Sequence, residues 1–227
     1  MLAGDGKYFQ KDRTIIMYER YLKYHLTQIF AIIAIVILSP LLLIITIAIK
    51  AEDPRGPVLF RQKRVGYRKQ YFQILKFRTM RTDAPHDVPT HLMNTDEYIT
   101  KCGRFLRKHS LDELPQLFNM IRTIQVEEKD GTTRRVPEMC FVGPRPALWS
   151  QDDLIRERDK YGANDVVPGL TGYAQIHGRD ELKIEEKARL DGYYVKHLGF
   201  RMDLSVLLGS VTEVFSGDGV VEGGADS

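Results

Sequence analysis

The chain has 227 residues, of which 43% are hydrophobic and 28% are charged. This composition excludes an intrinsically disordered chain, and the length allows one domain with or without an appendage. The formal net charge of +3 conceals an uneven distribution, because the segment from Arg55 to Arg81 holds nine Lys or Arg and no Asp or Glu. Such a segment predicts an anionic partner: phosphate groups, nucleic acid or an acidic membrane surface. Cys102 and Cys140 follow no motif spacing, so a disulfide framework is not expected.

The first predicted element is a membrane helix over residues 29–49, a run of 21 residues without a charge. A straight helix of this length would be about 31 Å long, which matches the thickness of the bilayer hydrocarbon. Ser39 and Pro40 lie at its centre and predict a break, because Pro40 cannot donate to the carbonyl one turn earlier. Two topologies are open: a kinked complete span, and a re-entrant hairpin within one leaflet. Basic residues at both ends, among them Lys23 and Lys50, favour the hairpin.

The remainder of the chain predicts a mixture of helices and short strands. The elements do not alternate regularly between strand and helix, so a doubly wound parallel sheet is not expected. No Walker loop or Gly-rich dinucleotide fingerprint occurs. The sequence predicts strands at 58–60 and 71–77 with a turn at 66–70, a polar loop at 81–95, helices at 96–108, 115–123, 152–161, 182–196 and 204–215, and a charged hairpin or loop at 127–137.

Adjacent carboxylates at Asp112 and Glu113 form the first candidate site. One interpretation is structural, since Ser110 followed by Glu113 is the pattern of a capping box. Pro115 argues against a helix that begins at Ser110 and fits better as the first helical residue, with both acids ahead of the helix. Two carboxylates in that position, beside Arg107, are suited to hold a divalent cation and an anionic substrate, and a carboxylate can attack phosphorus as a nucleophile.

Three further blocks supply candidate binding residues. Arg145 stands between two prolines after a glycine, which presents a guanidinium at little entropic cost and suits a phosphate clamp. Lys76 is the first residue of a block, Lys76 to Met80, near the end of the basic segment that lacks acids. This block is a candidate for binding phosphate, and the alternative is a basic face that lies on anionic lipid headgroups. The loop from Pro168 to Gln175 is rich in Gly and Thr, which lets backbone groups approach a ligand. Ordinary turns remain the alternative for the two loops.

Six sequence blocks together resemble the catalytic domain of the bacterial polyprenyl-phosphate phosphoglycosyl transferases, the sugar transferases that begin capsule, O-antigen and glycoprotein glycan assembly. They occur in the order of that family and cover about Tyr18 to Phe215. The blocks are Ser39-Pro40, Phe60 to Gly66 (FRQKRVG), Lys76 to Met80 (KFRTM), Ser110 to Leu117 (SLDELPQL), Val142 to Pro146 (VGPRP) and Pro168 to Gly172 (PGLTG).

The resemblance implies a fold and a reaction. The expected fold is α+β: a monotopic membrane protein with a re-entrant N-terminal helix broken at Ser39-Pro40, and a mainly helical cytoplasmic domain with a short β element. The expected reaction moves a sugar-1-phosphate from a UDP-sugar to polyprenyl (undecaprenyl) phosphate. Asp112 attacks the β-phosphate, UMP leaves, and the carrier phosphate then attacks the aspartyl phospho-sugar. Mg²⁺ supports the chemistry, and Glu113 is the second carboxylate of the dyad.

The same resemblance implies the remaining site residues. Lys76, Arg107 and Arg145 match the phosphate-binding basic residues of the family. Asp112 and Glu113 are the candidate metal ligands, and for Glu113 metal binding and proton handling are both open. The loop that holds Thr171, Gly172, Gln175 and Arg179 matches the nucleotide side. Tyr173 where Trp is common, and His177 and Asp180 where Asn is common, depart from the family pattern.

Location, partners and segments complete the expectations. The resemblance places the protein on the cytoplasmic face of the bacterial inner membrane, with membrane lipids, downstream glycosyltransferases or a second copy of the chain as partners. The membrane segment and the lack of recognition motifs argue against nucleic acid as a partner. The alternative is a membrane-anchored scaffold that binds lipid headgroups without catalysis. The expected segments are a polar N-terminal segment 1–17, an interfacial and re-entrant membrane helix 18–53, a catalytic domain 54–216 with an insertion 125–138, and a flexible tail 217–227.

Overall fold

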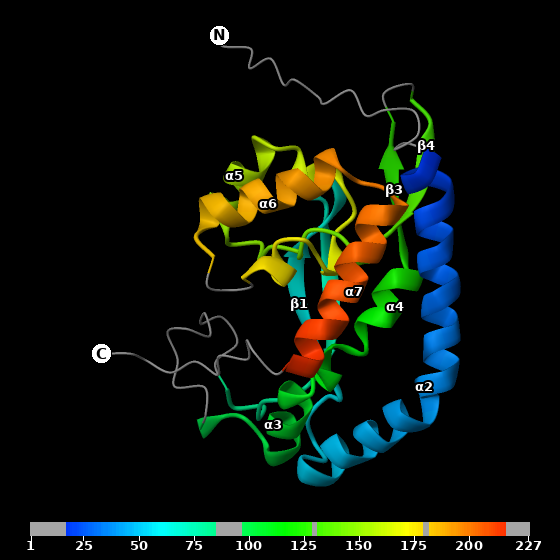
Figure 1. Cartoon of the computed structure of the whole chain (residues 1–227). Helices are drawn as coiled ribbons and strands as arrows, with labels where there is room; N and C mark the ends of the chain where they lie inside the picture. Colours follow the sequence, from blue (N-terminus) through cyan, green and yellow to red (C-terminus); the bar gives the residue numbers. More distant parts are fainter. Residues whose placement is uncertain (1–16, 85–96, 129–130, 179–181, 217–227) are drawn as a thin grey trace.

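The computed structural model describes residues 17–84, 97–128, 131–178 and 182–216. A long helix runs along one side of a body of helices and short strands and then turns beneath it (Figure 1). The predicted polar segment (apart from Met17), the predicted tail, Arg179 and most of the predicted polar loop 81–95 lie outside the described residues.

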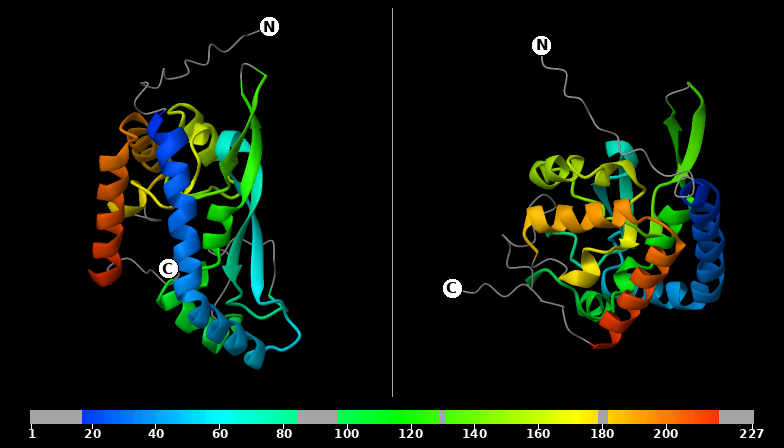
Figure 2. Two further views of the ribbon diagram at one scale, coloured as in Figure 1. Left: turned by 90° about the vertical axis from the view of Figure 1, so that its right-hand side faces the viewer. Right: turned by 45° about the horizontal axis from the view of Figure 1, so that its top comes forward.

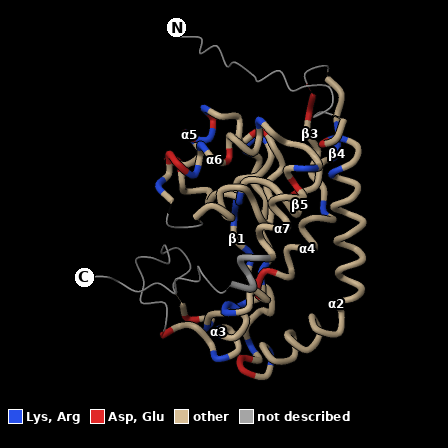
Figure 3. The backbone as a smooth tube through the Cα atoms, viewed as in Figure 1, with Lys and Arg blue, Asp and Glu red and all other residues tan. Residues whose placement is uncertain are grey.

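The long helix consists of a π-helical turn, η1 (Tyr18–Lys23), that continues into α2 (Tyr24–Glu52). Tyr18–Glu52 is long and apolar enough to cross a membrane, and only 11% of its most apolar window is buried within the protein. Charged residues are absent from most of its length (Figure 3). A helix that exposes so much apolar surface along one side of a protein belongs in a lipid environment.

The predicted break at Ser39-Pro40 is a bend within one continuous helix. Residues 24–52 are assigned to a single α-helix, and Pro40 is the one proline inside it. α2 changes direction sharply in both views (Figures 1 and 2). Sharp kinks in helices arise at proline, and the Ser39 hydroxyl donates to the carbonyl of Val36 at 2.8 Å. The predicted break at Ser39-Pro40 is therefore a bend, and the helix continues through it.

One face of α2 packs on the body along both arms of the bend. Ala31, on the first arm, lies in an apolar cluster with Phe72 and Met120. Ile45 and Ile49, on the second arm, lie in a cluster with Phe77 and Leu106. The opposite face remains exposed, and its large apolar side chains are Ile29, Phe30, Ile32, Ile33, Val36, Ile37, Leu43, Ile44 and Ile47.

In the part of the chain that the structure describes, the β structure consists of three two-stranded sheets, more than the single short β element that was expected. β1 (Leu59–Val65) and β2 (Tyr71–Phe77) form an antiparallel hairpin, so the predicted strand pair is confirmed and its first strand is longer than predicted. β3 (Thr123–Glu127) and β4 (Thr133–Pro137) form a second antiparallel hairpin, which projects from the body (Figure 2) and covers most of the predicted insertion. β5 (Cys140–Val142) pairs in parallel with β6 (Gly169–Thr171), a contact that the sequence did not predict.

The helices agree with the predicted ones to within two residues at most boundaries. α3 (Lys101–Lys108) begins five residues later than predicted, because the Thr100 side chain caps it by accepting from Gly103 N at 2.9 Å. α7 (Phe200–Ser216) begins four residues earlier than predicted. The remaining helices are α4 (Gln116–Ile121), α5 (Asp152–Asp159) and α6 (Ile184–Lys196). The 3-10 turns are η2 (Tyr67–Lys69), η5 (Leu111–Glu113), η6 (Ala163–Asp165) and η7 (Gln175–His177).

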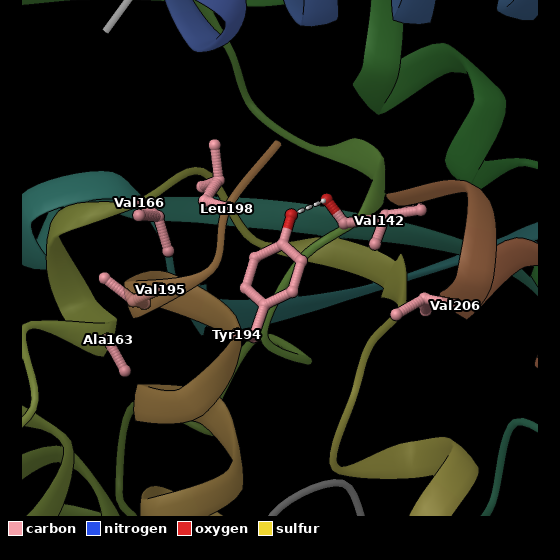
Figure 4. Close-up of a cluster of buried hydrophobic side chains, with 7 residues drawn as sticks. All are labelled: Val142, Ala163, Val166, Tyr194, Val195, Leu198 and Val206. Carbon is pink, nitrogen blue, oxygen red and sulfur yellow. Dashed lines mark hydrogen bonds between the residues drawn. The ribbon is translucent and has the colours of Figure 1, made fainter. Parts of the chain in front are cut away.

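The C-terminal helices join β5 through a buried cluster around Tyr194. Tyr194 is 1% exposed and packs with Val142 of β5 and Val206 of α7 (Figure 4). Its hydroxyl donates to the Asp203 carboxylate at 2.7 Å and lies 3.4 Å from the Val142 carbonyl. This cluster fixes the strand that leads into the Gly143–Pro146 loop, which carries Arg145.

Candidate active site

The two carboxylates lie on η5, between α3 and α4. Ser110 precedes this turn with φ = 54°, a left-handed conformation in which its side chain makes no capping hydrogen bond. The capping-box interpretation is therefore wrong. Pro115 is the N-cap of α4 rather than its first helical residue, and both Asp112 and Glu113 lie ahead of the helix as predicted.

Cations from two distant segments converge on Glu113. Lys76 Nζ, on β2, lies 2.7 Å from Glu113 Oε1 and 3.9 Å from Asp112 Oδ2. Arg145 Nη2 lies 2.9 Å from the same Glu113 oxygen. The side chains of Asp112, Glu113 and Lys76 are 13%, 19% and 19% exposed. The cluster is therefore mostly buried, but each side chain keeps some contact with solvent. The two carboxylates therefore have unequal contacts: Glu113 Oε1 lies within 3 Å of two cations, whereas Asp112 Oδ2 lies 3.9 Å from Lys76.

Arg107 reaches the site from α3. Its Nε donates to the Thr79 hydroxyl at 2.9 Å, and its charge acts on Asp112. α3 approaches the end of β2 closely, since a Cβ at Gly103 would lie 2.0 Å from the Thr79 carbonyl oxygen. Glu52, at the end of α2, accepts from the backbone N–H groups of the first two residues of α3 at 2.7 and 3.0 Å. The bent helix is thereby tied to the element that carries Arg107.

The surroundings shift the two carboxyl groups in opposite directions. Burial raises the pKa of Asp112 above its usual range, although Lys76 and Arg107 oppose this effect. Burial also raises the pKa of Glu113, but Arg145 and Lys76 outweigh it and lower that pKa to about 2. Glu113 is therefore ionised at any physiological pH. It neutralises part of the cationic charge that would otherwise pair with Asp112.

The loop predicted to lie on the nucleotide side is next to the Arg145 loop. Gly143 N donates to the Thr171 carbonyl at 2.9 Å, and a Cβ at Gly172 would lie 2.3 Å from the Gly143 carbonyl oxygen. The Thr171 hydroxyl is 2.5 Å from the hydroxyl of Ser210 on α7. Gln175 Nε2 donates to the Leu170 carbonyl at 3.3 Å. These contacts of Thr171, Gly172 and Gln175 join the loop to the Gly143–Pro146 segment, to α7 and to itself, rather than to the two carboxylates.

Sequence reasoning missed several residues that position the site. Thr79 lies inside the KFRTM block, so its proximity to Lys76 was a usable signal. Asn119 and Glu138 carry no local signal, because their partners are remote in the sequence. Glu52 lies at the end of an apolar helix, where the sequence alone predicts a charge in contact with water rather than a partner on α3.

The dyad is suited to share a metal ion with a substrate. Within the described ranges, no group of three or more His, Cys, Asp or Glu side chains is arranged around a common point. Asp112 and Glu113 supply two hard carboxylate donors. Mg²⁺ is commonly held by one or two carboxylates together with substrate phosphates and water, so the donor set fits Mg²⁺ in that mode and does not form an all-protein cage.

Comparison with known proteins identifies the family. The family model described as bacterial sugar transferase matches residues 18–217. The chain belongs to the bacterial sugar transferase family. The resemblance predicted from the six blocks is confirmed, and the protein is an enzyme of the transferase class.

Three relatives of this sugar transferase indicate how much of each protein is shared. A sugar transferase of Bacillus subtilis (strain 168), described as uncharacterized, is 34% identical over 86% of this chain and 88% of the relative. UDP-glucose:undecaprenyl-phosphate glucose-1-phosphate transferase of Caulobacter vibrioides is 39% identical over 79% of this chain and 64% of the relative. Undecaprenyl-phosphate glucose phosphotransferase of Komagataeibacter xylinus is 36% identical over 82% of this chain and 34% of the relative. The chain therefore spans only about a third to two thirds of the length of the latter two.

Proposed function

We propose that this sugar transferase moves a sugar-1-phosphate from a UDP-sugar to polyprenyl phosphate through a covalent aspartyl phospho-sugar on Asp112. The names of two relatives describe glucose-phosphate transfer to undecaprenyl phosphate, which supports the reaction class. The observation that carries the residue assignment is the unequal dyad: Glu113 is held by two cations at 2.7 and 2.9 Å, whereas Asp112 lies 3.9 Å from Lys76. Asp112 is the carboxylate that is free to approach a phosphorus atom.

The reaction has two balanced steps. In the first, an Asp112 carboxylate oxygen forms a bond to the β-phosphorus of the UDP-sugar, the bond to the bridging oxygen breaks, and UMP leaves with the electron pair. In the second, a phosphate oxygen of the carrier attacks the same phosphorus, and Asp112 leaves as a carboxylate. Lys76, Arg107 and Arg145 stabilise the charge that spreads over the phosphoryl oxygens, as fixed cations do in phosphoryl transfer.

The proposal includes Mg²⁺, which would be held by Asp112 and Glu113 together with the diphosphate. When bound, it supplies charge neutralisation at the transferring group. The chain's own residues supply the geometry: Glu113 keeps Lys76 and Arg145 in place because it remains ionised. Thr171, Gly172, Gln175 and Arg179 are proposed to line the nucleotide side, next to the Arg145 loop.

The membrane topology is a second part of the proposal: α2 is re-entrant and the domain lies on the cytoplasmic face of the inner membrane. Both ends of the long helix are held by the same folded body. At one end, Lys23 pairs with Asp203 of α7 at 3.0 Å. At the other end, Asp53 pairs with Arg78, and Lys50 donates to the carbonyls of two residues in the following turn. A straight span would remove one of these sets of contacts, because its ends would lie on opposite sides of the bilayer.

The covalent step is tested with purified protein, UDP-sugar, Mg²⁺ and no lipid acceptor. Wild type is expected to release UMP and to gain the mass of one phospho-sugar on the peptide that contains Asp112. Asp112→Asn is expected to lower UMP release by at least about 10⁴-fold, the scale of losing a covalent nucleophile. Asp191→Asn, which alters a buried carboxylate on α6, serves as the control. UMP release by Asp112→Asn at the wild-type rate would overturn the assignment.

The topology is tested with single-cysteine tags at both termini in right-side-out and inverted membrane vesicles. Both tags are expected to react with a membrane-impermeant maleimide only where the cytoplasmic face is accessible. A tag near Met1 that reacts from the outer face would establish a complete span instead.

A non-catalytic scaffold that binds lipid headgroups is the second candidate, favoured by the basic β1–β2 hairpin. It predicts vesicle binding that weakens with salt, is indifferent to Asp112→Asn and is not accompanied by nucleotide turnover.

A further inference from the structure

The outer edge of β2 is completed by a side chain rather than by a strand. β2 pairs with β1 on one edge, and no other described strand pairs with it. Asn119, on α4, occupies the second edge and is 0% exposed. Its Oδ1 accepts from Leu75 N at 2.9 Å, and its Nδ2 donates to the Gln73 carbonyl at 2.8 Å. The amide therefore replaces the ladder partner that a neighbouring strand would supply.

Glu138 completes this arrangement from the segment that follows the β3–β4 hairpin. Asn119 Nδ2 also donates to Glu138 Oε2 at 2.7 Å, and Glu138 is 6% exposed. The Glu138 backbone N–H donates to the carbonyl of Arg122 at 2.9 Å, and its other carboxylate oxygen lies 3.3 Å from Arg122 Nη2. Both amide protons and the amide oxygen of Asn119 are satisfied, which is the condition under which a buried polar group rigidifies a structure.

The Asn119 amide lies between the segment that follows the two carboxylates and the strand that carries Lys76. α4 begins three residues after Glu113, and Asn119 is on that helix. Leu75, its hydrogen-bond partner, immediately precedes Lys76. The amide therefore joins α4, the helix that follows the two carboxylates, to the strand that carries their shared cation. Apolar packing of Leu117 and Met120 on β2 also holds α4, but apolar contacts are non-directional, whereas two hydrogen bonds fix the register along the strand.

We propose that Asn119, held by Glu138, is a positioning residue that sets the contact between Lys76 and the dyad. The inference rests on the proposed function for its kinetic consequence, though not for its structural one. A displacement of Lys76 relative to Asp112 by about 1 Å would cost on the order of 10²-fold in rate, since phosphoryl transfer depends on positioning of fixed cations. The effect is expected on kcat rather than KM.

The hydrogen bond between Asn119 and Glu138 can be tested with a variant at position 119 and a compensating variant at position 138. Asn119→Asp keeps the acceptor for Leu75, removes both donors and places a second carboxylate against Glu138. We expect kcat for UMP release to fall by about 10- to 100-fold with KM within about threefold. When Glu138→Gln is added, the amide at position 138 can donate to the carboxylate at position 119, the reverse of the bond in wild type. This double variant is expected to have a kcat about tenfold higher than that of Asn119→Asp alone. Asp191→Asn, which breaks a buried pair with Arg158 away from the site, is the matched stability control and is expected to leave kcat per folded molecule within about twofold.

Two readouts do not require turnover. In Asn119→Leu, the amide proton of Leu75 is expected to exchange faster with solvent, and Lys76 is expected to be acylated faster by an amine-specific reagent, as followed by mass spectrometry. Unchanged Lys76 acylation alongside faster Leu75 exchange would overturn the positioning role. So would a kcat of Asn119→Asp within about twofold of wild type, or a double variant no better than the single one. If wild type turns over no UDP-sugar, the proposed function fails, and the acylation experiment still decides whether Asn119 positions Lys76.

Discussion

Lys23 and Lys76 each pair with a carboxylate, at 3.0 and 2.7 Å, yet the two pairs serve different purposes. Lys23 and Asp203 are 5% and 9% exposed, and Asp203 also accepts from the hydroxyls of Tyr18 and Tyr194 at 2.7 Å. That cluster is closed to solvent and its polar groups satisfy one another. It ties the start of the membrane helix to α6 and α7.

The Lys76 cluster is more open and has a carboxylate that is not clamped. Arg145 is 36% exposed, and Lys76 Nζ lies 3.9 Å from Asp112 Oδ2, compared with 2.7 Å from Glu113 Oε1. In a buried polar cluster whose groups are all hydrogen-bonded to one another, no group remains available to bind a ligand. A cluster with partly exposed cations and a loosely paired carboxylate can bind an anion through those cations. Solvent access and unequal pairing, rather than the presence of an ion pair, therefore distinguish the candidate site from a structural tie.

The largest effect is expected when one partner of the buried Lys23–Asp203 pair is removed. Lys23→Met leaves Asp203 buried without its cation and is expected to lower the free energy of unfolding by about 3–5 kcal/mol. Thermal unfolding in detergent or nanodiscs measures the loss, and UMP release per folded molecule is expected to remain near wild type. The double variant Lys23→Met with Asp203→Leu is expected to recover part of the stability, because no uncompensated charge remains. A double variant less stable than the single one would contradict a purely structural tie.

A smaller effect is expected from Arg145→Lys, which keeps the charge in the open cluster. The planar guanidinium presents several donors in a fixed arrangement, whereas an ammonium does not. We expect UMP release to fall by about 10- to 100-fold, with little change in the unfolding temperature, because the side chain is partly exposed. Arg156→Lys, on α5, is the control. Equal activity of Arg145→Lys and wild type would show that charge alone suffices at this position.

The smallest expected effect is a difference in pKa between the two carboxyl groups, which a titration of the metal-free protein would measure. Carbon-13 NMR of the side-chain carboxyls is expected to place the pKa of Glu113 near 2 and that of Asp112 above its usual value of 3.8. Because the folded-state pKa of Glu113 is depressed, its contribution to stability is complete above the ordinary value of 4.5 and is lost as the pH falls towards 2. Asp112 has the opposite sign: its raised pKa favours the folded state as the pH falls.

Variants assign these signals and supply the contrary outcome. Glu113→Gln and Asp112→Asn each remove one resonance, and Arg145→Leu is expected to raise the pKa of Glu113 because it removes the cation with the largest favourable effect. A Glu113 signal that titrates near 4.5 in wild type would remove the distinction between a clamped and an available carboxylate.

Several features were determined by the sequence alone, since they depend on residues within a few positions of one another. The uncharged run 29–49 specified an apolar helix, and Pro40 bent it because its ring removes a hydrogen bond of the same turn. Pro115 kept the two carboxylates outside α4. The 66–70 turn between two strand-forming segments specified the β1–β2 hairpin. The order of the motif blocks also identified the family.

The tertiary structure decided the features that depend on residues far apart in the chain. Only the fold shows that Glu113, rather than Asp112, receives Lys76 and Arg145, which come from segments 37 and 32 residues away. Only the fold brings Asn119 to the edge of β2 and pairs β5 with β6. Local patterns fix helix periods, turns and caps, because those energies arise between near neighbours. Ion pairs and edge contacts are set by the distances that packing imposes, and burial then decides how strongly each carboxyl group holds its proton.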